Sequence, residues 1–202
     1  CTAASRLIVH EKVLHAFTAK LVAATQALKV GHALEDGTQI GPVVSESQLT
    51  SNLRYIETGR AEGAELLCGG MRLDRATDGY FMAPAIFANT RNDMAINREE
   101  MFGPITCIQT AGSYAEALAL ANDTPFGLTA GIMTRSLARA NHFRANAKAG
   151  CVMINLPTAG TDYHVPFGGR GASSHGPREQ GRYAAEFYTT VKTAYTAVGV
   201  PE

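Results

Sequence analysis

The stretch of residues 113–155, SYAEALALANDTPFGLTAGIMTRSLARANHFRANAKAGCVMIN, decides the fold class. It begins with an amphipathic helical pattern, which is followed by the apolar strand pattern GLTAGIMT (127–134). A second helical pattern (136–150) and a second apolar strand pattern (151–155) come next. Because PITCIQTAG (104–112), just before the stretch, is also extended, the order is strand, helix, strand, helix, strand. This alternation predicts an α/β fold with a mainly parallel open sheet and flanking helices.

The N-terminal half adds further strands and helices. SRLIVH (5–10) has the branched apolar content of a short strand. A helical pattern continues from it to the turn at Gly31, and another begins at Ser45. ELLCGG (65–70) is a strand pattern closed by two glycines, and GYFMAPAIFANT (79–90) is an extended pattern.

The C-terminal part departs from this alternation. PFGGRGASSHGPREQG (166–181) is rich in glycine and predicts an irregular loop. The loop is not a phosphate loop, because it lacks the G-x-x-x-x-G-K-[ST] spacing and Ser174 occupies the last glycine position of G-x-G-x-x-G. AAEFYTTVKTAYTAV (184–198) alternates like a long exposed strand.

The composition is that of a compact globule with a sizeable core. The chain has 202 residues, of which 46% are hydrophobic and 18% charged. Its 18 basic and 18 acidic residues give a formal net charge of zero, so we expect neither a nucleic acid nor a membrane as a partner. The sequence shows no membrane-span or signal-peptide pattern, although an upstream segment could have carried a targeting sequence.

The cysteines and histidines give no sign of a metal centre. Cys1, Cys68, Cys107 and Cys151 are widely separated and form no C-x-x-C pair. The six histidines are also scattered, and two isolated imidazoles do not supply the three or four ligands of a zinc site. We therefore expect no metal, and the isolated thiols favour a cytoplasmic location.

The chain begins at Cys1, and the residues alone leave two explanations open. Either Cys1 is an exposed N-terminal nucleophile whose own α-amino group serves as the base. Or a longer chain has been cut, and Cys1 is an interior catalytic thiol with its supporting residues upstream. The acidic pair of Glu99 and Glu100 is, by itself, most simply a solvated helix surface.

Several motifs taken together point to one family. They are CTAASR (1–6), EEMFGPI (99–105), ANDTPFGLTAGIMT (121–134), GCVMIN (150–155) and the ends of the glycine-rich loop, PFGG and GPREQG. In this order and at these separations they resemble the catalytic domain of the aldehyde dehydrogenase superfamily over residues 1–192. NLPTAGTDYHVPFGG together with REQGRYAAEFYTTVKTAYT is most similar to the α-ketoglutarate semialdehyde dehydrogenase branch.

The resemblance implies a role for Cys1. It places the catalytic thiol there, with Ser5 and Arg6 in the matching positions. The implied reaction is attack of the thiolate on an aldehyde, hydride transfer to NAD or NADP, and release of the acid from a thioester by a glutamate-activated water. The NAD(P)-binding domain, the glutamate base and an oxyanion-binding asparagine are implied upstream of Cys1. The chain alone is therefore expected to be inactive.

The resemblance also implies three further site residues. Glu100 matches the glutamate that binds the nicotinamide ribose hydroxyls, and Phe102 matches the aromatic residue beside the nicotinamide. Phe167 matches an aromatic residue that lines the aldehyde funnel, and residues 155–164 match the loop at the mouth of that funnel. The implied substrate is a small semialdehyde.

The resemblance divides the chain into two parts. Residues 1–185 correspond to a partial catalytic domain, and residues 186–202 to an oligomerisation strand and tail. EFYTTVKT resembles the strand that extends a neighbouring subunit's sheet, which implies a homo-oligomer, a dimer or tetramer, of the complete enzyme.

The glycine-rich loop departs from the motif of the family, and two other function classes remain as alternatives. Where many relatives have S-G-x-G-R-E, this chain has SSHGPRE, with Ser174 in place of glycine and Pro177 before Arg178. The first alternative function is an N-terminal-nucleophile amidohydrolase that attacks through Cys1. The second is a folded module without activity.

Overall fold

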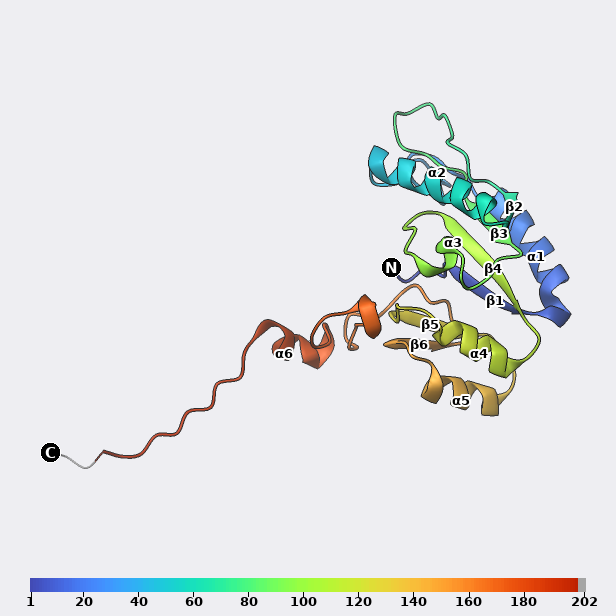
Figure 1. The fold of residues 1–202 in the computed structure, drawn as a ribbon. Helices are drawn as coiled ribbons and strands as arrows, with labels where there is room; N and C mark the ends of the chain where they lie inside the picture. The colour runs from blue at the N-terminus through green and yellow to red at the C-terminus, as the bar shows by residue number, and fades with distance from the viewer. Residues whose placement is uncertain (200–202) are drawn as a thin grey trace.

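The computed structural model describes residues 1–199, and its elements follow the predicted order (Figure 1). The strands are β1 (Arg6–His10), β2 (Glu65–Cys68), β3 (Ala85–Ala88), β4 (Ile105–Ala111), β5 (Thr129–Ile132) and β6 (Cys151–Ile154). The helices are α1 (Glu11–Gln26), α2 (Glu46–Ala61), α3 (Ala95–Arg98), α4 (Tyr114–Asn122), α5 (Leu137–Asn146) and α6 (Ala184–Tyr188). Two 3-10 turns, Gly171–Ser173 and Gly181–Tyr183, lie in and just after the glycine-rich loop.

The strands form two sheets. The larger has the order β1-β4-β3-β2, in which β1 and β3 run parallel to β4 and only β2 is antiparallel to its neighbour. The smaller is the parallel pair of β5 and β6. The prediction of an α/β fold with mainly parallel strands is confirmed. β1 starts at Arg6, and the residues before it are joined to β5 by a hydrogen bond from Thr129 Oγ1 to the Thr2 carbonyl at 3.5 Å.

Serine side chains start three of the helices. Ser45, Ser113 and Ser136 have extended backbones, and their hydroxyls accept hydrogen bonds from the backbone N–H groups three residues later. Each hydroxyl satisfies a donor that the first turn of a helix leaves free, which is worth about 1 kcal/mol. These caps set where α2, α4 and α5 begin.

The main core lies between the larger sheet and α2. Leu49 and Ile56 of α2 pack with Phe87 of β3 and Cys107 of β4, and all four are buried. Gly59 allows the close approach, because a Cβ there would lie 2.9 Å from the Phe87 ring. The sheet and α2 therefore form one rigid layer.

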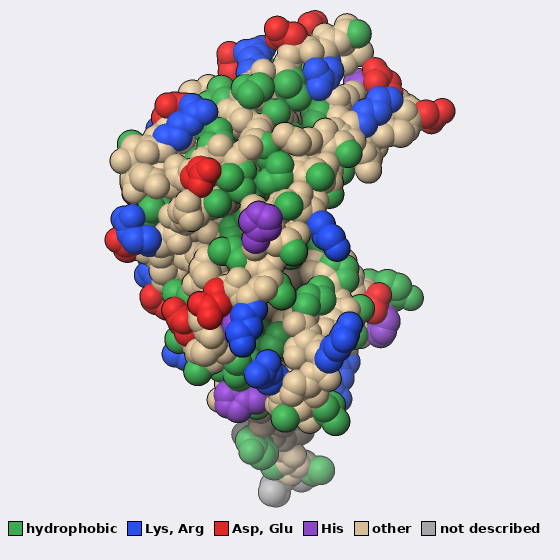
Figure 2. Space-filling view, turned by 90° about the vertical axis from the view of Figure 1, so that its right-hand side faces the viewer, with side chains coloured by type: hydrophobic (Ala, Val, Ile, Leu, Met, Phe, Trp, Pro, Cys, Tyr) green, Lys and Arg blue, Asp and Glu red, His purple; other side chains and the backbone are tan. Residues whose placement is uncertain are grey.

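The opposite face of this sheet is covered by α1. Leu14 and Val22 of α1 pack against Val9, Ile86 and Ile108, and an apolar groove of about 470 Å³ remains between the helix and the strands. Figure 2 views this side of the molecule, where apolar side chains gather across the face and charged side chains of both signs are interspersed.

The C-terminal segment differs from the predicted strand. Residues Ala184–Tyr188 form the short helix α6, and residues 189–199 contain neither helix nor strand. Figure 1 shows this segment running away from the body of the molecule. The alternating pattern can stabilise a strand only where a neighbouring strand supplies hydrogen bonds, and the chain places none beside it. Residues 200–202, the end of the predicted strand and tail, lie outside the described residues.

Candidate active site

Three of the predicted site segments converge at one edge of the sheets. Residues 1–5 run past the start of β4, where Thr106 Oγ1 donates to the Ala4 carbonyl at 2.9 Å and Cys107 N–H donates to the Ser5 carbonyl at 2.9 Å. The acidic-aromatic turn, residues 99–103, leads directly into the same end of β4. Figure 1 shows the N terminus and this turn on the same side of the molecule. Cys1, Glu100 and Phe102 are thus carried by neighbouring segments.

Cys1 is the most accessible of the four thiols. It is free and exposed, whereas Cys68 and Cys151 are partly buried and Cys107 is fully buried between the sheet and α3. Burial raises the pKa of the Cys107 thiol to about 12. Since the thiolate is the reactive form, Cys107 cannot compete as a nucleophile.

Glu100 and Phe102 both point away from the core. Glu100 is exposed, and the Phe102 side chain is 56% exposed. Phe102 also has a φ of 52°, in the left-handed region that non-glycine residues rarely adopt. An exposed carboxylate beside an exposed ring is suited to bind a ribose diol and an adjoining planar group.

The third segment carries Phe167. Its backbone exchanges two hydrogen bonds with Glu179, of 2.8 and 2.9 Å, so that the two ends of the glycine-rich loop are joined. The following residue, Gly168, lies against Gly150 at the start of β6, because a Cβ on Gly150 would collide with the Gly168 carbonyl. Phe167 is therefore held near the edge at which β5 and β6 begin.

The residues at which the glycine-rich loop departs from the usual motif form hydrogen bonds in the structure. Ser174, which stands where many relatives have glycine, accepts a hydrogen bond from the Gly169 N–H at 2.6 Å. Arg178 donates to the Gly169 carbonyl, and Ser173 accepts from Gly127 N–H at 3.0 Å. Ser174 and Arg178 thus hold the loop together around Gly169, and Ser173 fixes it to the start of the segment that leads into β5.

The predicted funnel-mouth loop, residues 155–164, is held at Asn155 and also near its other end, where the Tyr163 carbonyl accepts from the Gly181 N–H at 3.2 Å. Asn155 has a φ of 57°, and its amide exchanges two hydrogen bonds with the backbone of Thr134, at 2.8 and 2.9 Å. Beyond it, Leu156 and Tyr163 are exposed. The loop presents apolar and aromatic surface outward from a fixed base.

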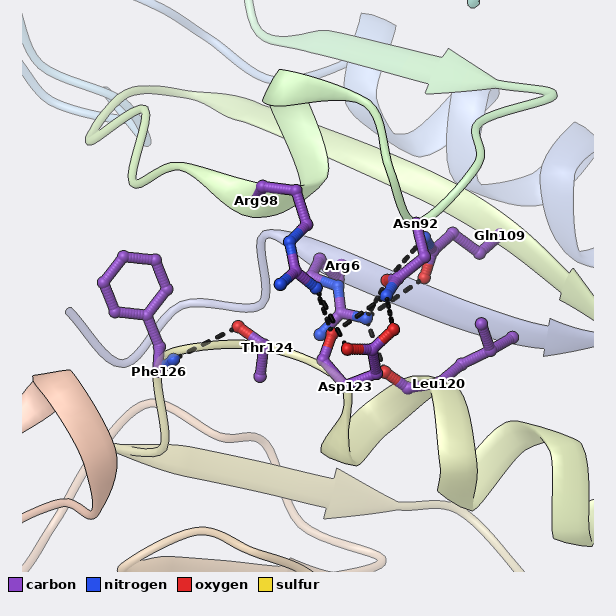
Figure 3. Close-up of polar contacts among 8 residues, drawn as sticks. All are labelled: Arg6, Asn92, Arg98, Gln109, Leu120, Asp123, Thr124 and Phe126. Atoms are coloured by element: carbon purple, nitrogen blue, oxygen red, sulfur yellow. Dashed lines mark hydrogen bonds and ion pairs between the residues drawn. The ribbon is translucent and has the colours of Figure 1, made fainter.

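A polar network joins Arg6 of β1, which follows the thiol-bearing segment, to α3, α4 and the loops beside them (Figure 3). Arg6, five residues after Cys1, donates through Nη2 to Asn92 Oδ1 at 2.5 Å and to the Leu120 carbonyl at the end of α4 at 2.6 Å. Burial lowers the pKa of the Arg6 guanidinium, and the nearby positive charge of Arg98 adds to this effect. The network therefore holds a partly buried cation mainly through neutral acceptors.

Asn92 and Asp123 extend this network toward the acidic-aromatic turn. The Asn92 amide donates to the Asp123 carboxylate at 2.6 Å, and Arg98, next to Glu99 in the chain, pairs with the same carboxylate at 3.2 Å. Hydrogen bonds from Arg98 and then Asn92 lower the pKa of the Asp123 carboxyl. The sequence indicated Arg6 and the motif containing Asp123, but nothing in it pointed to Asn92 or to the short helix α3 that carries Arg98.

Neither a metal centre nor a membrane-spanning element is found among residues 1–199. In this range no three His, Cys, Asp or Glu side chains are grouped so that they could hold a metal ion. None of the helices described there has the length and apolarity needed to cross a membrane.

Comparison with known proteins gives one consistent family. The aldehyde dehydrogenase family profile matches residues 1–194. The chain is 42% identical to the alpha-ketoglutaric semialdehyde dehydrogenase of Bacillus subtilis and 43% identical to the alpha-ketoglutarate semialdehyde dehydrogenase of Haloferax volcanii, in each case over 96% of its length. It is 40% identical to a betaine aldehyde dehydrogenase of Brucella anthropi over 98% of its length.

Solved structures agree with these relatives. The structure of HpcC from Thermus thermophilus superposes on the whole chain with a TM-score of 0.89 at 39% identity. A betaine aldehyde dehydrogenase of Staphylococcus aureus in complex with NAD+ matches 91% of the chain with a TM-score of 0.87 at 31% identity. The chain spans about 40% of the length of the Bacillus and Haloferax relatives and of the Thermus structure.

Proposed function

Because the chain belongs to the aldehyde dehydrogenase family, we propose that it is the part of an NAD(P)-dependent aldehyde dehydrogenase that carries the catalytic thiol, Cys1. The observation that carries the proposal is the convergence of the Cys1 segment and the acidic-aromatic turn at the start of β4. The substrate is an aldehyde, and the product is the corresponding carboxylic acid.

The proposed chemistry uses the Cys1 thiolate as nucleophile. Its sulfur attacks the aldehyde carbon, and the carbonyl electron pair moves to oxygen to give a thiohemiacetal. A bound NAD(P) supplies the hydride acceptor. Loss of the hydride from carbon and of the proton from the hydroxyl oxygen leaves a thioester on Cys1. Attack by water then breaks the acyl C–S bond, which releases the acid and restores the thiol. The position of Arg6 on β1 keeps the Cys1 segment anchored through these steps.

The residues present fit a nicotinamide nucleoside. Glu100 offers an exposed carboxylate, which can accept hydrogen bonds from both hydroxyls of a ribose. Phe102 offers an exposed ring beside it, which can pack against a planar group. Phe167, held by Glu179, forms part of the wall for the aldehyde in this proposal.

A small semialdehyde that carries a carboxylate is the proposed substrate. The relatives from Bacillus and Haloferax, both named for α-ketoglutarate semialdehyde, support this choice. Residues 155–164, with the exposed Leu156 and Tyr163, are the proposed selectivity loop. Comparison of semialdehyde with betaine aldehyde as substrates tests the choice, since a higher kcat/KM for betaine aldehyde would reject it.

The proposal extends to the surroundings of the complete protein. The glutamate base, the oxyanion asparagine and the main NAD(P)-binding domain belong, in this proposal, to a part of the protein that precedes Cys1. Residues 1–185 then form the catalytic part, and residues 186–202 contribute to a homo-oligomer. Four free cysteines support a cytoplasmic location.

The decisive experiment compares this chain with the full-length protein that contains it. We expect NADH formation from a semialdehyde by the full-length protein only, and its loss in Cys1→Ala. Removal of one oxyanion donor typically costs about 10²–10³ in rate, so loss of the base and cofactor domain together leaves the chain alone without measurable turnover. Cys1-dependent turnover by the chain alone contradicts the proposal. Amide hydrolysis that is lost on acetylation of the N terminus favours the N-terminal-nucleophile alternative instead.

A further inference from the structure

The acidic-aromatic turn is attached to α2 by three of its five residues. Glu100 and Phe102 are exposed and are the two residues that the proposed function uses. Glu99 contacts α2 through its carboxylate and Met101 through its backbone carbonyl, while Gly103 lies against Asn52. Of these three residues only Met101 is buried. The turn is therefore attached to the helix through every second residue, which leaves the other two free to face a ligand.

The attachment is made by one face of α2. Tyr55 donates from its hydroxyl to Glu99 Oε2 at 2.7 Å. Gln48 donates from Nε2 to the Met101 carbonyl at 3.0 Å and to Asn52 Oδ1 at 2.8 Å. Gln48, Asn52 and Tyr55 are spaced at i, i+4 and i+7, so they lie on the same side of the helix.

Close packing leaves the turn no room to shift toward the helix. Asn52 is completely buried, and a Cβ on Gly103 would collide with its amide group. Met101, between the two polar contacts, is 3% exposed. The left-handed backbone of Phe102 is unfavourable for a residue with a side chain, so these contacts must hold it.

The two acidic residues consequently have different surroundings. Glu99 is engaged by Tyr55, whereas Glu100 is directed outward. The hydrogen bond to the Glu99 carboxylate, assisted by partial burial, raises the pKa of the Tyr55 hydroxyl above its ordinary value. Both acidic residues are exposed, as the sequence indicated, and the structure adds a hydrogen bond from Tyr55 to Glu99.

We propose that Tyr55 is a positioning residue, which through Glu99 fixes the Glu100 carboxylate and the Phe102 ring where the nicotinamide ribose binds. This inference rests on the proposed function and adds a residue outside the motifs that carry it. Tyr55 acts through the turn and does not touch the cofactor. Its loss therefore disturbs the placement of the hydride acceptor and leaves the Cys1 thiol intact.

The test uses Tyr55→Phe in the full-length protein, which removes the hydroxyl and keeps the ring. Displacement of a reacting group by about 1 Å can cost 10²-fold in rate, so we expect a single-turnover hydride rate that is about 10- to 100-fold lower. KM for NAD(P) should rise, while the rate at which iodoacetamide alkylates Cys1 stays unchanged. The matched control is Tyr114→Phe, which removes another 2.8 Å hydroxyl contact, to His142, between α4 and α5. We expect normal kinetics for it.

Variants at Glu99 separate positioning from a general loss of stability. Glu99→Gln keeps an oxygen that accepts from Tyr55, so most of the hydride rate should remain. Glu99→Ala should be as slow as Tyr55→Phe, and the double variant should be no slower than either. If the losses in hydride rate of the two single variants add in the double variant, the positioning role is overturned. It is overturned as well if Tyr55→Phe has normal kinetics while Glu100→Gln is slow. Both results leave the proposed function standing. If Glu100→Gln has a normal hydride step, or the unsubstituted protein forms no NADH, the proposed function itself fails and the role of Tyr55 fails with it.

A second readout does not depend on turnover. Carbon-13 NMR of labelled tyrosine in the same protein follows the ionisation of each hydroxyl. Tyr55 should titrate at higher pH than an exposed tyrosine, and Glu99→Ala should bring it back toward the ordinary range. An unshifted Tyr55 shows that the hydrogen bond is absent, and this result overturns the proposal.

Discussion

Accessibility distinguishes the four thiols at the scale of single residues. Cys1 is exposed, and Cys107 is buried with a pKa raised to about 12. We expect iodoacetamide near neutral pH to alkylate Cys1 first and to reach Cys107 only after unfolding. Peptide mapping by mass spectrometry measures the order of modification. Alkylation of Cys107 in the folded chain at a rate comparable to that of Cys1 contradicts this.

The buried thiol also makes stability depend on pH. Because burial holds the folded pKa of Cys107 near 12, above the ordinary value of 9.0, the folded state keeps its proton in a range where the unfolded state loses it. Its contribution is fully present below about pH 8.5 and declines by up to about 1.4 kcal/mol per pH unit as the pH rises toward the folded pKa. Urea unfolding at mildly alkaline pH should show a steeper decline for the unsubstituted chain than for Cys107→Ala. Equal slopes would mean that Cys107 ionises freely in the folded state.

Local motifs predict the proposed site residues, whereas long-range contacts do not show in the sequence. Short motifs such as EEMFGP predict each of the proposed site residues, Cys1, Glu100, Phe102 and Phe167. Tyr55 lies 44 positions from Glu99, and no sequence motif connects the two residues. Only the packing of α2 on the sheet brings the two together, which is a property of the tertiary structure.

The polar network around Arg6 gives a prediction at the scale of elements. Asn92 accepts from Arg6 and donates to Asp123, so Asn92→Ala leaves the partly buried guanidinium with fewer acceptors. We expect a loss of about 1–3 kcal/mol in the free energy of unfolding. Asp93→Ala is the control, because its neighbouring ion pair with Arg91 is exposed and worth little. Equal losses of unfolding free energy in the two variants would show that the hydrogen bonds of Asn92 do not stabilise the fold more than an exposed ion pair does.

Close approach of two backbones gives a second prediction at this scale. Gly150→Ala forces a Cβ into the Gly168 carbonyl, so the segment that carries Phe167 must move away from β6. We expect destabilisation by about 1–3 kcal/mol and faster tryptic cleavage after Arg170, which is exposed in the same loop. Gly41→Ala is the control, since its Cβ meets only an ordinary contact at 3.8 Å. Unchanged cleavage in Gly150→Ala would reject the packing described for the loop.

Elements with both a periodic pattern and a cap were predictable from sequence. Ser45, Ser113 and Ser136 mark the starts of α2, α4 and α5, and the apolar runs give the strands between them. The four-residue helix α3 was missed because it is too short to show a period. The separation of β5 and β6 from the larger sheet was missed as well, since strand order depends on pairing and not on pattern.

The C-terminal segment is the feature that concerns the whole molecule. Within residues 189–199, Val191, Tyr195 and Val198 are each more than 90% exposed, and these residues form no strand with the body of the chain. The alternating pattern and the β-branched residues of this segment nevertheless favour a strand. The pattern predicts a pairing that this chain does not supply to itself.

We expect this segment to drive self-association of the chain. A strand without a partner presents free backbone N–H and C=O groups, and pairing with a second copy satisfies them while covering Val191 and Tyr195. Sedimentation of the chain should therefore depend on concentration, and truncation after Tyr188 should give a monomer with unchanged circular dichroism from the body of the fold. The matched variant carries both Val191→Lys and Tyr195→Lys, which keep the length of the chain but place positive charge on the strand face. Charge repulsion between two copies should weaken the association of this variant. A monomer at all concentrations in the unsubstituted chain contradicts the prediction. If truncation leaves association intact, the C-terminal segment is not the contact surface, and the face of α1 with the exposed Val13 and Phe17 is the next surface to test.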